Sequence, residues 1–309
     1  MITHRIVRGA LAIGVVSVFL GGGAVVVLAA THGKSPGPAG PATASSIQAL
    51  PVTCPSPALG GQLPALVYLP PGYSARGRRY PVVYFLHGLP ATPQSYTQNA
   101  FVARSLLAAR QRAIVVAPQG ARTAGADREY LDWSPTENWP LAISRDLTVC
   151  IDHRFHTIAT RAGRTLVGLS AGGYGAFNIG LRNLQTFAAV ESWSGYFVAT
   201  DPSGYHVLQL PTPHARQAAT VPDGEWLAAE LRRWPALIAF YVGRADQRFL
   251  AMNETFDATL RKHDIAHVFR IYAGGHSASL WETQAPAWLS MALRYAATGH
   301  SAVQGGSVR

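Results

Sequence analysis

Three residues of this sequence have the types and the chain order of a nucleophile, an orienting acid and a base. Residues 168–172 read Gly-Leu-Ser-Ala-Gly, the G-x-S-x-G pattern in which a sharp strand-to-helix turn exposes the hydroxyl of Ser170. The competing interpretation is an inert serine in a glycine-rich turn. We favour the nucleophile because a strand is expected before this turn and a helix after it.

A serine hydroxyl needs a base that removes its proton, and the candidate is His276. It ends a Gly-Gly-His triplet between the last expected strand and the last expected helix. In hydrolases with this serine turn the histidine comes last in the chain, in that loop. A loop histidine read alone is more often a solvated surface residue, so the chain order carries this prediction.

The acid that orients the histidine should follow a strand between these two residues, and Asp246 meets that requirement. Its carboxylate would hold the imidazole in the productive tautomer. The competitors fall elsewhere: Glu254, Asp257 and Asp264 on or at the end of the following helix, and Asp223 in an irregular stretch. The alternative role of Asp246 is the N-cap of that helix.

Two backbone N–H groups are expected to form an oxyanion hole beside Ser170. One belongs to Ala171, the residue after the nucleophile, and the other to Leu89. Leu89 ends the triplet His87-Gly88-Leu89, which follows an expected strand, and Gly88 lets the chain turn there. His87 comes too early in the chain to be the base, so we expect a structural or substrate-facing role for it.

The elements that must position these residues alternate between short apolar runs and helical periodicity. This pattern is typical of an α/β fold: a mostly parallel central sheet with helices on both faces, in three layers. The expected strands are 63–69, 82–86, 113–117, 165–169, 188–193, 237–242 and 268–272. The expected helices are 101–110, 139–155, 171–184, 249–262 and 282–295, and residues 200–225 are expected to be irregular.

The composition allows a large folded core and argues against a nucleic-acid partner. The chain has 309 residues, of which 48% are hydrophobic and 14% charged, with a formal net charge of +10. Its lysines are Lys34 and Lys262, and its arginines are scattered instead of forming a basic run that could follow phosphates.

Residues 1–30 are expected to be a signal peptide or an N-terminal membrane anchor. Arg5 and Arg8 precede an apolar run from Gly9 to Ala30, which is longer than a usual signal core and contains three consecutive glycines. The positive N-terminus directs the chain after it out of the cytoplasm. We predict an exported protein, either secreted or tethered to the outer face of the cytoplasmic membrane.

Composition also divides the rest of the chain. Residues 31–50 are rich in Pro, Gly, Ala and Ser, which predicts a flexible linker. We expect a catalytic domain at residues 51–297 and a disordered tail at residues 298–309. Cys54 and Cys150 predict one disulfide because an exported chain meets oxidising conditions. Two separate buried thiols are the alternative.

These motifs resemble those of the esterase family that contains esterase D (S-formylglutathione hydrolase), the feruloyl esterases and the mycobacterial antigen 85 mycolyltransferases. The resemblance covers about Leu63 to Ala296 and rests on LHGL at 86–89, GLSAGGYGA at 168–176, GRAD at 243–246, and GGH at 274–276 with Trp281 beyond. It implies the α/β-hydrolase fold, a serine triad, and neither a metal nor an organic cofactor. Antigen 85 enzymes have aspartate where His87 stands, which argues against trehalose mycolyl transfer.

The triad and the resemblance together predict a serine esterase that works through an acyl-enzyme on a small-molecule or lipid ester. An acyltransferase of the antigen 85 type, acting on cell-envelope lipid or sugar acceptors, is the alternative, because water exclusion depends on the shape of the pocket. A non-catalytic cell-wall or carbohydrate-binding protein on the same fold is the second alternative. His87, Trp133 and Tyr174 are the candidate substrate contacts, with core packing as their other interpretation.

Overall fold

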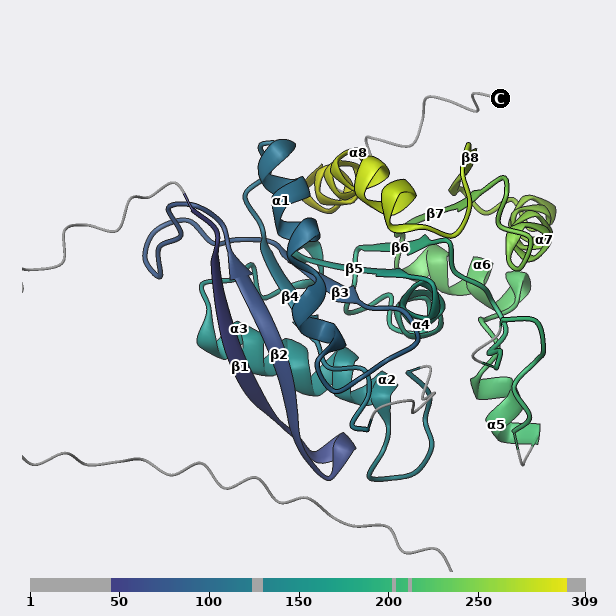
Figure 1. Cartoon of the computed structure of the whole chain (residues 1–309), viewed down its shortest axis with the longest axis horizontal. Helices are drawn as coiled ribbons and strands as arrows, with labels where there is room; N and C mark the ends of the chain where they lie inside the picture. The colour runs from purple at the N-terminus through teal and green to yellow at the C-terminus, as the bar shows by residue number, and fades with distance from the viewer. Residues whose placement is uncertain (1–45, 124–129, 202–203, 211–212, 299–309) are drawn as a thin grey trace, which may run out of the picture. The chain divides into compact units, whose positions relative to one another are not determined.

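An eight-stranded sheet lies at the centre of the computed structural model, which describes residues 46–123, 130–201, 204–210 and 213–298 (Figure 1). The strand order is β1-β2-β4-β3-β5-β6-β7-β8; β1, β2 and β4 pair antiparallel and all later pairings are parallel. The strands are β1 (Gln48–Ser56), β2 (Gly61–Leu69), β3 (Val82–Leu86), β4 (Ile114–Pro118), β5 (Arg164–Leu169), β6 (Ala189–Trp193), β7 (Leu237–Gly243) and β8 (Val268–Tyr272). The seven strands expected from the sequence are confirmed.

Helices cover both faces of this sheet because successive strand side chains point to opposite sides. Phe85, Trp193 and Tyr241 face a layer formed by α1 (Ala100–Ala108) and α8 (Ala278–Thr298), which lie side by side in Figure 1. Tyr84 and Phe240 face the other layer. That layer includes α2 (Trp139–Leu141), a π-helical turn η3 (Ala142–Leu147), α3 (Thr148–Arg154), α4 (Ala171–Gly180), α6 (Gly224–Arg233) and α7 (Leu250–Lys262). The predicted three-layer α/β architecture is confirmed.

Two regions of the structure differ from the sequence expectation. Strand β1 begins at Gln48, inside the stretch expected to be linker, and its register with β2 buries Val52 and Cys54. The irregular stretch 200–225 contains α5 (Pro213–Ala218) and the start of α6, where the carboxylate of Asp223 accepts a hydrogen bond from the Trp226 N–H at 2.9 Å. Both were missed because these segments have few large apolar residues and no clear period.

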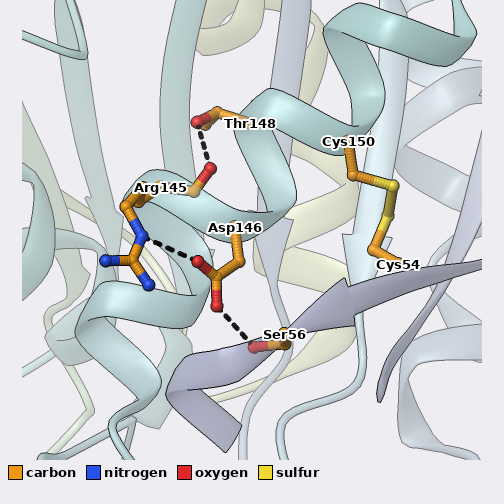
Figure 2. Close-up of a disulfide and its surroundings, with 6 residues drawn as sticks. All are labelled: Cys54, Ser56, Arg145, Asp146, Thr148 and Cys150. Carbon is orange, nitrogen blue, oxygen red and sulfur yellow. Dashed lines mark hydrogen bonds and ion pairs between the residues drawn. A yellow bond between two sulfur atoms is a disulfide. The ribbon is translucent and has the colours of Figure 1, made fainter. Parts of the chain in front are cut away.

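A disulfide joins Cys54 of β1 to Cys150 of α3, as the sequence predicted, across 96 residues of chain (Figure 2). Next to it lies the buried carboxylate of Asp146. Its Oδ2 accepts hydrogen bonds from Ser56 Oγ at 2.8 Å and from the Ala58 N–H at 3.1 Å, and its Oδ1 accepts one from Arg145 Nε at 2.8 Å. The N-terminal hairpin is therefore fastened to α3 and η3 both covalently and by hydrogen bonds.

The predicted N-terminal segment 1–30, most of the 31–50 linker and nearly all of the 298–309 tail lie outside the described residues. In the part of the chain that the structure describes, none of the helices combines the length and the apolar character needed to cross a bilayer.

Candidate active site

Ser170 occupies a tight turn between β5 and α4. Its backbone has φ 54° and ψ −123°, a conformation that costs energy for a residue with a side chain and persists only when the surroundings impose it. A Cβ on Gly168 would come within 2.0 Å of the Gly172 carbonyl oxygen, and one on Gly172 within 2.0 Å of the Leu86 oxygen. The two flanking glycines are therefore required by the closeness of the adjoining backbones.

The hydroxyl of Ser170 and the side chains of His276 and Asp246 form one hydrogen-bonded line. Ser170 Oγ lies 2.9 Å from His276 Nε2, and His276 Nδ1 lies 2.7 Å from Asp246 Oδ2. The three residues follow β5, β8 and β7, whose parallel pairing brings their carboxyl ends to one edge of the sheet. Asp246 is 2% exposed and Ser170 8%, so both ends of the line are buried, and Ser170 lines the cleft.

The loops that carry Asp246 and His276 contact each other through the backbone. The Ala245 N–H donates to the Gly274 oxygen at 2.8 Å, and a Cβ on Gly243 would lie 2.5 Å from that same oxygen. The carbonyl of Asp246 also accepts from the Leu250 N–H at 3.0 Å, where α7 begins. The spacing between acid and base therefore depends on main-chain contacts more than on mobile side chains.

The competing carboxylates lie in other surroundings. Asp257 pairs with Arg261 at 2.9 Å and with His267 at 2.8 Å, and Asp223 caps α6. Neither of them contacts His276, so the geometry places Asp246 in the position that an orienting acid requires.

Two aromatic rings pack against the His276 imidazole. The Trp281 ring meets it edge-on, with centroids 5.0 Å apart, and the Phe249 ring does so at 5.3 Å. Trp281 is itself fixed, because its indole N–H donates to Ser194 Oγ at 3.0 Å. These contacts restrict the imidazole to an orientation that serves both of its hydrogen bonds.

The two expected oxyanion donors border the cleft beside Ser170, whose lining includes Leu89 and Ala171. Ala171 is the first residue of α4, so its N–H has no acceptor within the helix, and the positive end of the helix dipole faces the same place. A Cβ on Gly88 would lie 2.9 Å from Ser170 Cβ, which explains how the loop bearing Leu89 can approach the nucleophile so closely.

His87 holds this loop and does not face the cleft. Its Nε2 accepts from the Gly120 N–H at 3.0 Å, so the proton is on Nδ1, which lies 3.0 Å from the Gly88 oxygen; the Tyr130 hydroxyl donates to the His87 oxygen at 2.9 Å. Burial lowers the pKa of His87, which keeps the ring neutral. Since the C=O and N–H of a trans peptide point in opposite directions, fixing the Gly88 carbonyl also fixes the Leu89 N–H.

The remaining expected substrate contacts also lie away from the cleft. Tyr174 is fully buried, donates through its hydroxyl to the Ala219 oxygen, and stacks on Tyr196 with centroids 5.1 Å apart. Trp133 lines a separate small cavity with Leu131 and Leu210. The geometry therefore favours the core-packing interpretation of Trp133 and Tyr174, and the structural role of His87, over substrate contact.

The cleft beside Ser170 has a volume of about 70 Å³ and is lined by residues that the sequence did not single out. They share a position in the turn after β7 or in the stretch after β6, and are Tyr196, Thr200, Asp201, Gly204, Arg248 and Phe249. Within the described residues, no group of three or more His, Cys, Asp or Glu side chains is arranged to hold a metal ion.

This chain is similar to known proteins both in sequence and in fold. Esterase Rv1288 of Mycobacterium tuberculosis H37Rv is 32% identical over 129 residues, which are 42% of this chain and only 28% of that protein. The S-formylglutathione hydrolase of Agrobacterium tumefaciens has a similar structure, with a TM-score of 0.65 at 21% identity over 82% of this chain and 97% of that one. M. tuberculosis MPT51 gives a TM-score of 0.58 at 19% identity over 81% of this chain and 100% of that one.

These structural likenesses share the α/β-hydrolase fold with this chain, as the resemblance predicted. A model of the family described as "Putative esterase" matches residues 56–291, a range that includes Ser170, Asp246, His276 and the two expected oxyanion donors. This chain therefore belongs to the esterase family of α/β-hydrolases.

Proposed function

We propose that this protein is an exported serine esterase that hydrolyses carboxylic esters through an acyl-enzyme formed on Ser170. The observation that carries the proposal is the hydrogen-bonded line from Asp246 through His276 to Ser170, which ends at a cleft bordered by two candidate oxyanion donors. Each member of this line has the chemistry that acyl transfer needs: a nucleophile, a base that activates it, and an acid that orients the base.

The reaction would proceed in two steps. Ser170 Oγ attacks the ester carbonyl while His276 Nε2 takes its proton, and the N–H groups of Ala171 and Leu89 stabilise the negative charge on the carbonyl oxygen. His276 then gives the proton to the leaving alcohol, and an acyl group stays on Ser170. Water, activated by His276, releases the acid and restores the serine.

The small cleft favours short groups on at least one side of the ester. Its volume is about 70 Å³, so we expect a short acyl group such as acetate to fit beside Ser170 better than a long one. The Cys54–Cys150 disulfide supports export, because disulfides persist in oxidising compartments. The apolar N-terminal run supports it independently.

The test is hydrolysis of 4-nitrophenyl acetate and 4-nitrophenyl octanoate by the full-length wild-type chain, Ser170→Ala and His276→Ala. We expect the acetate to be the better substrate, and both variants to lose roughly a thousandfold or more in kcat, because the three residues act as a unit. Wild-type rates in Ser170→Ala would contradict the proposal.

A further inference from the structure

The turn that carries Asp246 also places an arginine in the cleft. Arg248 lines the cleft together with Ser170 and His276. Its guanidinium carbon lies 5.0 Å from the centroid of the Phe249 ring, and its side chain is only 29% exposed. The aromatic face therefore holds this guanidinium against the cleft wall, where an ordinary surface arginine would extend into water.

The N–H donors of this guanidinium are not used by the described parts of the protein. Arg248 Nε lies 4.0 Å from Asp246 Oδ1, beyond hydrogen-bond distance, and no described residue accepts a hydrogen bond from Arg248. Arg182, also partly buried, instead donates to the carbonyl oxygens of Gln217 and Thr220. A planar fork of free donors in a cleft matches the two oxygens of a carboxylate.

The position of Arg248 indicates which part of an ester it would meet. His276 must protonate the leaving alcohol, so the alcohol portion lies on the His276 side of Ser170. Phe249 packs against His276 with ring centroids 5.3 Å apart, and Arg248 stacks on the same Phe249 ring. Arg248 therefore lies on the leaving-group side of the nucleophile.

The charges around the cleft favour a single negative charge on the ligand. Asp201 also lines the cleft, where its Oδ1 accepts from the Gly204 N–H and its Oδ2 lies 3.0 Å from His206 Nδ1. Asp246 is nearby as well, and both aspartates repel a dianionic phosphate more strongly than a carboxylate, whose single charge one guanidinium can pair with.

We propose that Arg248 is a specificity-determining residue that selects esters whose alcohol portion carries a carboxylate. This inference rests on the proposed esterase function, because it assumes that the ester carbonyl lies at Ser170. It adds a class of substrate that neither the triad nor the oxyanion donors specify.

The experiment compares 3- and 4-acetoxybenzoate with the uncharged 3- and 4-acetoxybenzamide, measuring kcat/KM for the full-length chain. We expect the wild type to prefer the anionic ester of at least one pair, and Arg248→Gln to reduce that preference by about tenfold or more. Arg248→Lys should retain part of it. Arg244→Gln, at an exposed arginine in the same turn, is the matched control and should leave the preference unchanged.

The inference would be overturned if the wild type and Arg248→Gln showed the same ratio of kcat/KM for the anionic and the uncharged ester. An equal loss of kcat/KM on both esters would mean that Arg248 supports Asp246 and does not select the carboxylate. Calorimetric titration of Ser170→Ala with the same esters tests the anion site without chemistry. Tighter binding of the benzoate, lost when Arg248 is replaced, would support the anion site even if the wild type hydrolysed neither ester. The absence of hydrolysis would then count against the esterase proposal alone. Equal binding of benzoate and benzamide would overturn the anion site.

Discussion

The two buried aspartates that fasten distant parts of this chain have different surroundings. Asp146, beside the disulfide, uses both of its oxygens: Oδ2 accepts two hydrogen bonds and Oδ1 accepts one from Arg145. Asp246, at the active edge of the sheet, uses Oδ2 for His276, and no described residue donates a hydrogen bond to its Oδ1. Both side chains are almost completely buried.

Under the proposed mechanism, this difference separates a carboxylate that stabilises the fold from one that serves the reaction. Burying a charge is costly unless hydrogen bonds replace the lost water, and Asp146 has that replacement at both oxygens. Asp246 has it at one oxygen, from an imidazole whose charge must change during turnover. We therefore expect Asp146 to matter for stability and Asp246 for rate.

The largest expected difference is between the matched substitutions Asp246→Asn, which should affect the rate, and Asp146→Asn, which should affect the stability. Asp246→Asn should reduce kcat by roughly a thousandfold to ten-thousandfold, because an amide cannot stabilise the imidazolium and favours the wrong tautomer. Asp146→Asn should leave kcat unchanged and lower the free energy of unfolding by about 1–3 kcal/mol, because hydrogen bonds to a charged acceptor are lost. Kinetics and urea unfolding of both variants check this, and an exchange of the two effects would contradict the comparison.

Removing the disulfide tests how the N-terminal hairpin contributes to stability, separately from the active site. The double variant Cys54→Ser/Cys150→Ser should lose about 2–4 kcal/mol of unfolding free energy, since the bond closes a loop of 96 residues and restricts the unfolded chain. Activity per folded molecule should be unchanged, because the disulfide contributes nothing to the cleft lining. Denaturant unfolding and titration of active sites measure the two quantities. A large loss of turnover in fully folded protein would show that the disulfide-linked hairpin and the active site are coupled.

A third buried carboxylate, Glu191 of β6, should make the stability of the fold depend on pH. Its Oε2 accepts from the Trp193 indole N–H at 3.0 Å, and burial raises its pKa from 4.5 to about 8 against the opposing effect of that hydrogen bond. The folded state therefore keeps this proton between about pH 4.5 and 8, while the unfolded state releases it. The contribution of Glu191 to the free energy of unfolding should therefore fall as the pH rises through that window, by at most about 1.4 kcal/mol per pH unit.

Glu191→Gln keeps the hydrogen-bond acceptor and removes the titration. Urea unfolding at pH 5, 6, 7 and 8 should give a flatter dependence on pH for the variant than for the wild type. Identical slopes for the two proteins would mean that Glu191 does not hold a proton in the folded state.

The positions of the three triad candidates could be anticipated because they depend on local signals. Gly168 reflects a backbone contact with Gly172 inside the same turn, and the chain order of Asp246 and His276 follows from the parallel strands that precede them. Gly172 is required instead by the Leu86 carbonyl of β3, which lies far away in the chain. The same parallel pairing explains why residues more than a hundred positions apart meet at one edge.

The partners of His87 and the residues that line the cleft could not be anticipated, because they depend on packing between distant segments. The partners of His87 are Gly120 and Tyr130, which lie 33 and 43 residues further along the chain. Arg248 and Asp201 border the cleft only because the turn after β7 and the stretch after β6 fold over the same place. No period in either segment indicates which side chains face the nucleophile.

The central claim is that Ser170 is an activated nucleophile. The most direct measurement is reaction of the full-length protein with a fluorophosphonate probe, followed by mass spectrometry of the labelled peptide. We predict a single label on Ser170 that is lost in His276→Ala and retained in Asp146→Asn. An unlabelled Ser170, under conditions where a control serine hydrolase reacts completely, would contradict the proposed catalysis.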